Sequence, residues 1–265
     1  IRELTDKPFG AGATLLMPGA RENAEVLLKE KVPVINVSLG KCGWIAERAH
    51  KYGGKVIATV VNEKHAMGAE QQGADALQVT GHEAAAHGGQ VTTMVLVPAI
   101  VNAVKIPVVA IGGIADGRGM AAALALGAEG VGMGTRLSMT KESPVALKTI
   151  EAQLKAGIED TLYSSRFDGL YCRVLKTPAA EKAIRQGMSL PRAFFASIRI
   201  AKLMNLPWFK LAIGTMLQGP KTMIQLAHFA TAFDKIQAAT EAGDLDKGVQ
   251  LIGQVQGIID DIPSV

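Results

Sequence analysis

Two histidines and a glutamate lie within the segment GHEAAAHGG at residues 81–89, directly after a run of residues typical of a buried strand. An imidazole titrates near neutral pH, so it can act as a general acid or base. We predict that His87 is catalytic, because Gly88 and the glycine after it let the loop lie close to a bound cofactor. A loop histidine that only hydrogen-bonds is the alternative. His82 is predicted to be structural, and two histidines with Glu83 lack the further ligands of a zinc site, so no metal is predicted.

Two glycine-rich segments follow neighbouring predicted strands: GGIADGRG from residue 112 and GMGTR from residue 132. After each strand the backbone must turn tightly and bring its N–H groups to an anion without a Cβ in the way, which favours glycine. In (β/α)8 barrels, the loops after the seventh and eighth strands form such a phosphate site beside the start of a short helix. We therefore predict a phosphate cradle, with ordinary glycine-rich βα turns as the alternative.

These segments belong to a chain that repeats one unit, namely an apolar β-rich run, a polar or glycine turn and a helical pattern. Strands that alternate with helices indicate a parallel sheet, in a barrel or a doubly wound fold. The predicted strands are Phe9–Leu15, Val32–Val37, Lys55–Val61, Ala74–Val79, Ile106–Ile111 and Gly130–Met133.

The glycine-rich loops follow the fifth and sixth of these strands, whereas a (β/α)8 barrel forms its phosphate site after the seventh and eighth. We therefore predict an α/β fold of the TIM (β/α)8 type whose first two βα units are missing from this sequence, which starts at Ile1 without an initiator methionine. An open six-stranded sheet is the alternative, but it would leave long apolar edges exposed.

The pattern changes near residue 145, which predicts a barrel portion over residues 1–145 and a mainly helical cap over residues 146–265, with the C-terminal helices packing back on the barrel. Residues 182–187, 192–204 and 220–242 have helix formers and apolar residues at helical spacing. One apolar stripe is predicted to pack in the core, with the lining of a substrate pocket as the alternative. It consists of Met204, Trp208, Phe209, Met216 and Phe229. By pattern, His50, His65 and His228 lie on helical surfaces.

Composition excludes several classes of protein. The chain has 265 residues, of which 48% are hydrophobic, so it can bury a substantial core. No uncharged apolar run reaches the roughly 18 residues of a membrane helix, and no signal peptide is recognisable. Two cysteines indicate no disulfide framework, which favours the cytoplasm. The net charge of +4 is scattered, so nucleic acid and membranes are not predicted partners. The apolar cap makes a homodimer possible.

The chain resembles the FMN-dependent nitronate monooxygenases, formerly called 2-nitropropane dioxygenases, and the related FabK-type enoyl reductases. The resemblance covers nearly the whole sequence. It includes LTDKPFG at residues 4–10, the histidine loop, residues 106–119, residues 123–136, and the distant segments GDLDKG at 243–248 and GQVQG at 253–257.

This resemblance implies an FMN whose phosphate lies on the backbone of Gly112, Gly113, Gly134 and Thr135, with its ring across the mouth of the barrel. His87 then occupies the position of the family histidine near the reactive face of the flavin, with Gly88 beside it, and Gln254 lies in a segment close to the ring. A nitronate monooxygenase oxidises an anionic nitronate with O2 to a carbonyl compound and nitrite. His87 would steady that anion or take the proton from a neutral nitroalkane.

The sequence departs from the family pattern at several positions. The front segment that supplies a strand end under the flavin is absent. Gly12 stands where relatives often have asparagine, Thr59 where many monooxygenases have lysine, and alanines precede His87 where a small pair, often glycine, is usual. Two alternatives therefore stay open. One is an NAD(P)H-dependent flavin reductase acting on an enoyl thioester or a quinone, since TTM at residues 92–94 resembles the enoyl reductases. The other is a non-catalytic FMN-binding protein.

Overall fold

The computed structural model describes residues 1–17, 19–85, 87–187, 194–195, 197–198, 201, 207–209 and 220–265. Contacts within the chain divide it into two units. The first contains residues 1–81, 91–111 and 120–132, and the second contains residues 82–90, 112–119 and 133–265. This division differs from the boundary predicted at residue 145, because the loops after two strands of the first unit pack with the later part of the chain.

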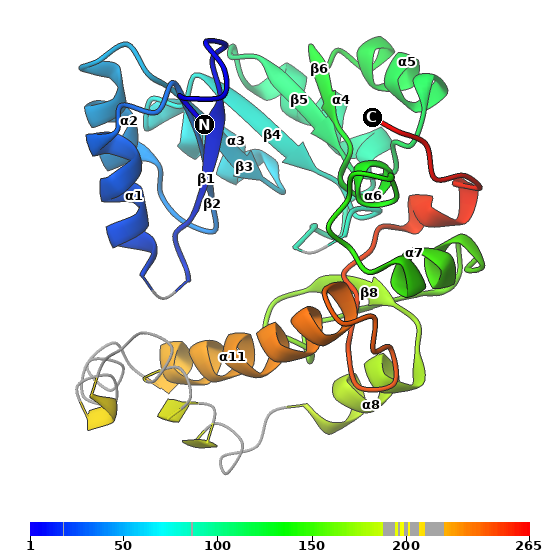
Figure 1. Cartoon of the computed structure of the whole chain (residues 1–265). Coiled ribbons are helices and arrows are strands. Elements are labelled where there is room, and N and C mark those ends of the chain that lie inside the picture. Colours follow the sequence, from blue (N-terminus) through cyan, green and yellow to red (C-terminus); the bar gives the residue numbers. More distant parts are fainter. Residues whose placement is uncertain are drawn as a thin grey trace. The chain divides into compact units, whose positions relative to one another are not determined.

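The first unit is built on one parallel sheet of six strands (Figure 1). The strands pair in the order in which they occur in the chain, as in a (β/α) barrel, whereas a doubly wound sheet reverses direction at a switch point. Their bounds are β1 Gly10–Thr14, β2 Val34–Ser38, β3 Lys55–Val60, β4 Ala76–Thr80, β5 Val108–Ile111 and β6 Gly130–Gly132.

Helices follow the strands and bury their apolar sides. They are α1 Ala20–Lys29, α2 Gly43–His50, α3 Glu63–Gln71, α4 Thr93–Ala103 and α5 Gly117–Ala125. The core of this unit combines alternate strand residues, such as Val56 and Leu77, with helix residues such as Ile45 and Ile100. Small alanines on α2 and α3 are fully or almost fully buried, which lets these helices pack closely on their neighbours.

All six predicted strands are present, in the predicted order and with ends that differ by at most two residues. Three strands begin two residues later than predicted, at Val34, Ala76 and Val108. Val34 and Val108 each follow a proline, which cannot donate a hydrogen bond to the sheet. The predicted α/β class is therefore confirmed.

The second unit combines helices with a short hairpin. Its helices are α6 Gly134–Ser138, α7 Leu147–Leu154, α8 Pro178–Gln186, α11 Pro220–Thr240 and the 3-10 helix η1 Gln254–Ile258. Between them lies an antiparallel hairpin of β7 Thr161–Ser164 and β8 Cys172–Leu175. These strands have four residues each, too few for their alternation to stand out in the sequence.

The predicted apolar stripe has mixed outcomes. Phe229 is buried, whereas Trp208 and Phe209 are 39% and 57% exposed, so core packing was wrong for these two. Trp208 instead contacts the ring of Phe194 and donates a hydrogen bond to Ser197, which are local interactions. Met204, Met216 and most of the helix predicted over 192–204 lie outside the described residues. Within the described part, no helix has the length and apolar character to cross a membrane.

Candidate active site

Loop 82–89 follows β4 and contains the predicted catalytic histidine. The hairpin of the second unit holds its start. Arg173 on β8 is buried and donates from Nε and Nη2 to the His82 carbonyl oxygen, at 3.3 and 3.0 Å, and from Nη1 to Thr161 Oγ1 at 2.9 Å. Burial lowers the pKa of Arg173, but a guanidinium remains charged at neutral pH. A buried cation thus fixes the first residue of the loop.

Tyr163 on β7 holds the end of the same loop. Its hydroxyl lies 2.9 Å from the Gly88 carbonyl oxygen and 3.1 Å from that of Gly89, so its one proton is shared between them. His82 Nδ1 lies 3.0 Å from the Gly89 carbonyl oxygen, and its ring meets Tyr163 edge-on at 4.5 Å. Burial raises the pKa of Tyr163, which keeps the hydroxyl a donor. The predicted structural role of His82 is consistent with these contacts.

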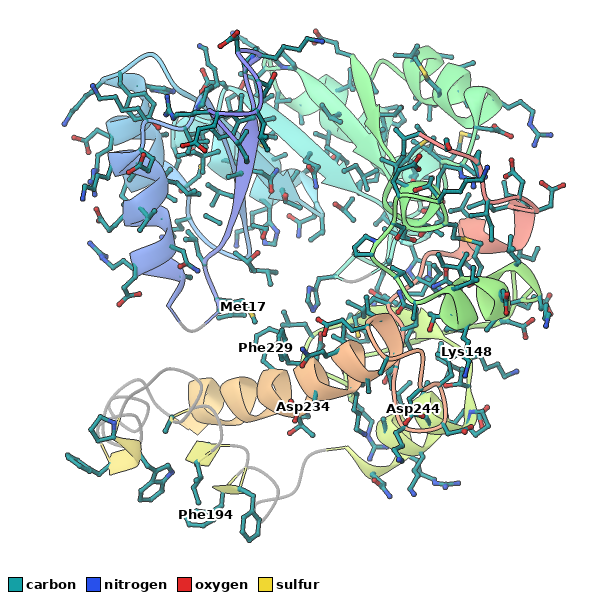
Figure 2. All side chains as sticks on the ribbon, in the orientation of Figure 1. Met17, Lys148, Phe194, Phe229, Asp234 and Asp244 are labelled. Carbon is teal, nitrogen blue, oxygen red and sulfur yellow. The ribbon has the colours of Figure 1, made fainter. Side chains whose placement is uncertain are left out.

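His87 pairs with a carboxylate that the sequence did not indicate. Its Nε2 lies 2.7 Å from Asp168 Oδ2, and Asp168 Oδ1 accepts a hydrogen bond from the Leu170 N–H at 3.0 Å. The Asp168 side chain is 4% exposed and the His87 side chain 23%. The ring of Phe229, labelled on α11 in Figure 2, meets the His87 ring edge-on at 6.2 Å. The imidazole is therefore oriented from two sides and remains partly accessible.

Two further titratable groups lie near this carboxylate. His228 on α11 is partly buried, which corrects the predicted surface position, and it hydrogen-bonds to the backbone of Phe167. Burial lowers the pKa of His228, so it is neutral at pH 7. Burial and the nearby Asp168 raise the pKa of the Cys172 thiol. In the described part of the chain, no group of three such side chains is arranged to hold a metal ion.

The first glycine-rich loop has the backbone that a phosphate cradle needs. Gly112 and Gly113 have φ values of 109° and 73°, which disfavour any residue with a Cβ. A Cβ on Gly113 would also lie 3.4 Å from Glu83 Cβ, so this loop touches the start of the histidine loop.

The second glycine-rich segment meets the distant segment at 253–257. Thr135 is buried on α6, and its Oγ1 accepts a hydrogen bond from the Gly253 N–H at 3.0 Å. The next residue, Gln254, donates its backbone N–H to the Glu83 carbonyl oxygen at 2.9 Å. Three segments far apart in the sequence, those of Glu83, Thr135 and Gln254, are thus joined by hydrogen bonds.

The residues present fit a phosphate-bearing cofactor. Gly112 and Gly113 have the predicted backbone form, and a Cβ at Gly134 would meet nothing within 4 Å, so the backbone at the start of α6 has room beside it. Behind this segment, Arg136 is fixed by Asp261, at 2.6 Å from its Nη1. Glu83 lies next to Gly113 and hydrogen-bonds to Gln254, and Gly253 hydrogen-bonds to Thr135. His87 and Gly88 hydrogen-bond to residues of the hairpin and its loop.

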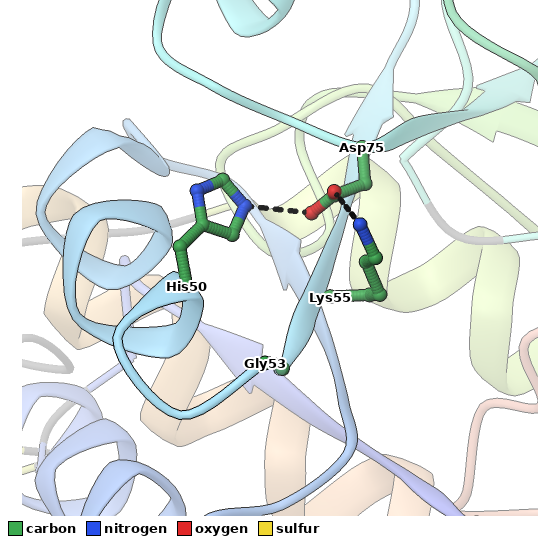
Figure 3. Close-up of a pocket in the computed structure, with 5 residues that line it drawn as sticks. His50, Gly53, Lys55 and Asp75 are labelled. Carbon is green, nitrogen blue, oxygen red and sulfur yellow. Dashed lines mark hydrogen bonds and ion pairs between the residues drawn. The ribbon is translucent and has the colours of Figure 1, made fainter.

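A second histidine–carboxylate pair lies at the opposite, N-terminal ends of the strands in the first unit (Figure 3). His50 Nε2 lies 2.9 Å from Asp75 Oδ2, and Lys55 Nζ lies 2.8 Å from Asp75 Oδ1. With Gly53 and Gly54 these residues line an open pocket of about 180 Å³. In (β/α) barrels the N-terminal strand ends serve stability and the C-terminal ends serve catalysis. We therefore place the candidate site at the histidine loop.

The six parallel strands pair in chain order, as in a (β/α) barrel, and the candidate site residues lie mainly in the loops that follow β4, β5 and β6. The family model described as nitronate monooxygenase matches residues 16–265. The chain belongs to the nitronate monooxygenase family, a family of flavoprotein oxidoreductases, and it is an oxidoreductase.

The names of individual relatives describe different enzymes. The (3aS,4S,5R,7aS)-5-hydroxy-7a-methyl-1-oxo-octahydro-1H-indene-4-carboxyl-CoA dehydrogenase of Mycobacterium tuberculosis is 36% identical over 100% of this chain and 77% of its own length. A "Probable nitronate monooxygenase" of Staphylococcus aureus is 33% identical over 63% of this chain and 50% of its own length. The structure of FabK from Thermotoga maritima has a TM-score of 0.78 and 36% identity, covering 99% of this chain and 74% of FabK.

Proposed function

We propose that this protein is an FMN-dependent oxidoreductase in which His87 exchanges a proton with a substrate that is an acid at carbon. Backbone groups of Gly112, Gly113, Gly134 and Thr135 would hold the FMN phosphate, and Gly88 and Gln254 would lie beside the ring. When bound, FMN supplies the redox chemistry. The protein supplies the phosphate cradle, the position of the imidazole and its partner carboxylate.

One observation carries this proposal. The histidine loop contacts the cradle at one end, where the Glu83 carbonyl oxygen accepts from Gln254 N–H and Glu83 Cβ lies close to Gly113. The same loop contains His87, whose imidazole is held by Asp168. A cofactor bound in the cradle and the imidazole would therefore be positioned by one continuous segment, which a general base near a cofactor requires.

The first substrate class is the alkyl nitronate, which the family description names. A nitroalkane loses its α-proton to a base and becomes a nitronate anion, so His87 would be needed for the neutral form and less needed for the preformed anion. Oxidation of the nitronate with O2 to a carbonyl compound and nitrite completes the proposed reaction.

A second substrate class is an enoyl thioester of coenzyme A, which would accept electrons at its carbon–carbon double bond, with NADH or NADPH as the electron donor. The observation that favours it is the extent of similarity, since the relative named a carboxyl-CoA dehydrogenase matches 100% of this chain and the one named a nitronate monooxygenase matches 63%. Electrons from the nicotinamide would reduce the double bond, and His87 would give a proton to the carbon next to the thioester carbonyl, the reverse of its step with a nitroalkane.

The visible spectrum of the purified protein tests the proposal. It should show bound flavin, and we would record it without oxygen before and after adding a nitronate to one sample and NADH or NADPH to another. An enoyl-CoA thioester added to the second sample should restore the colour. Bleaching by nitronate alone would support the first class, and bleaching by reduced nicotinamide would support the second. A flavin that none of these bleaches would indicate a non-catalytic FMN-binding protein and overturn the proposal.

Small molecules and O2 are the partners we propose. The helix α4 has no charged residue and exposes Met94 and Val95, which agrees with the homodimer considered from the sequence. The homodimer and a cytoplasmic location stay predictions.

A further inference from the structure

We infer that Asp168 is a positioning residue that fixes the tautomer of His87 and so makes Nδ1 the atom that exchanges the proton with substrate. This inference rests on the proposed function and adds to it a residue and an atom. An imidazole can work through either nitrogen, and the hydrogen bond on one of them decides which is available.

The geometry of the pair supports this assignment. His87 Nε2 lies 2.7 Å from Asp168 Oδ2, a short separation typical of a hydrogen bond to a charged acceptor. An ionised carboxylate only accepts hydrogen bonds, so Nε2 must hold the proton and donate it. In the neutral ring, Nδ1 is then the unprotonated nitrogen. It is the one that can accept a proton.

The carboxylate is itself held in place. Asp168 Oδ1 accepts the Leu170 N–H at 3.0 Å, within the loop between β7 and β8. That hairpin also anchors the histidine loop through Arg173 and Tyr163. The carboxylate and the loop that carries His87 are thus fixed to one element, which limits the rotation of the imidazole.

Two further titratable side chains near the pair are uncharged at neutral pH. His228 has a lowered pKa because it is buried, and Cys172 has a raised one, so both are neutral at pH 7 beside Asp168. The ring of Phe229 meets the His87 ring edge-on. Among the described groups near the carboxylate, His87 is then the one that gains a charge during proton transfer.

The proton step follows from this arrangement. The α-C–H bond of the substrate breaks, its electron pair stays on the substrate as the carbanion or nitronate, and the proton forms a new N–H bond at His87 Nδ1. The ring becomes an imidazolium with both nitrogens protonated, and the Asp168 carboxylate balances its charge. In Ser-His-Asp enzymes a buried carboxylate has the same two effects on an imidazole.

The test compares Asp168→Asn with the wild type, Asp168→Glu and the control Asp160→Asn. Asparagine keeps an oxygen for the Leu170 N–H but removes the charge that requires a proton on Nε2. Asp160 directly precedes β7, and its side chain accepts a hydrogen bond from the Gly157 N–H. Asp160→Asn therefore shows the effect of removing a carboxylate next to the same hairpin that is not paired with His87.

We expect Asp168→Asn to lower kcat on a neutral nitroalkane at least about tenfold while changing the rate on the preformed nitronate much less, because only the first needs the base. Asp168→Glu should recover part of the loss, and Asp160→Asn should behave as the wild type. Equal losses on both substrates with Asp168→Asn would show a structural role only and overturn the inference.

A second readout does not depend on turnover. The ¹⁵N spectrum of the five histidine rings, with the His87 signals identified by their absence in His87→Asn, should show His87 protonated on Nε2 in the wild type and lose that preference in Asp168→Asn. A wild-type ring protonated on Nδ1 would overturn the inference even if the enzyme is active. A flavin that no substrate bleaches, with the expected ring tautomer, would instead overturn the proposed function.

Discussion

The described residues include two histidine–carboxylate pairs with similar nitrogen–oxygen distances, 2.9 and 2.7 Å, in different surroundings. In the His50–Asp75 pair the side chains are 43% and 20% exposed, and Lys55 shares the carboxylate. In the His87–Asp168 pair they are 23% and 4% exposed. The first pair joins the end of α2 to the starts of β3 and β4, whereas the second lies in the loops beyond the strand ends. The residue types alone therefore do not define an active site.

The strongest test of this contrast replaces each histidine by asparagine. His87→Asn should retain flavin and lower the rate on a neutral nitroalkane by roughly 10²- to 10⁴-fold, the usual contribution of a general base. His50→Asn should leave that rate unchanged, because its pair serves the fold. Steady-state kinetics with nitroalkane and preformed nitronate measure both. A comparable loss in His50→Asn would show that the two pairs are not functionally distinct.

A second prediction compares two glycines with positive φ, one at each end of the strands. Gly113 and Gly53 have φ values of 73° and 81°, so valine at either should cost about 1–3 kcal/mol of stability through backbone strain. Gly113→Val should also expel FMN, since the strained backbone would leave its cradle form and the side chain would press on Glu83. Gly53→Val should keep the flavin, because a Cβ there meets nothing within 4 Å.

Flavin content after purification and the midpoint of urea unfolding separate the two effects. Flavin retained by Gly113→Val would contradict the cradle. Flavin lost by both variants would mean that strain, wherever it lies, is enough to release the cofactor, and the contrast between the two ends would fail.

The interactions of Asp75 should make the free energy of unfolding depend on pH. Burial alone would raise the pKa of Asp75, but hydrogen bonds from Lys55, the Val56 N–H and His50 outweigh it and lower the pKa below its ordinary value of 3.8. A lowered pKa means that the folded state binds this proton less tightly than the unfolded state. The resulting stabilisation is present above the unfolded value and is lost as the pH falls through the folded one.

Asp75→Asn should therefore lower the free energy of unfolding by about 1 kcal/mol at pH 7 and have a smaller effect under acid conditions, given partial solvent screening. Urea unfolding of the wild type and the variant at a series of pH values measures this. The flavin spectrum and activity should not change. A loss that is the same at every pH would mean that the carboxylate charge does not contribute.

The contrast also shows which features could be predicted from the sequence. The six strands were predictable because each is a run of apolar residues bounded by turns, and proline explains the late starts at Val34 and Val108. The first glycine-rich loop was predictable because the positive φ values of Gly112 and Gly113 demand glycine. The order of strands and helices in the first unit therefore follows from local sequence patterns.

The partner of His87 was not predictable from local signals. Asp168 lies 81 positions further along the chain, on a loop between two strands of four residues that the pattern did not separate from helix. Arg173 and Tyr163 likewise act through tertiary contacts that no spacing encodes. His228 had the spacing of a surface residue, but the neighbouring loop at Phe167 partly buries it. Residues that hold a functional group through the fold must be found in the structure.

The smallest expected effect is a difference in the labelling rates of the two cysteines. Each cysteine reports local opening near one of the histidine–carboxylate pairs. Cys42 is the N-cap residue of α2, which ends at His50, and Cys172 is the first residue of β8, near Asp168. Both thiols are buried and free, and burial raises the pKa of each. A thiol reagent acts on the thiolate, so both should react slowly in the native protein, and Cys172 more slowly because Asp168 raises its pKa further.

Labelling followed by mass spectrometry of the peptides gives the two rates separately, and in denaturant the rates should become similar. Slow labelling of Cys172 would mean that the hairpin stays closed around Asp168, as the fixed orientation of His87 requires. Labelling of Cys172 faster than Cys42 in the native protein would mean that the hairpin opens locally more often than the region of α2. In that case the Asp168 carboxylate could not hold His87 in one orientation, and the difference between the two pairs would be one of exposure alone.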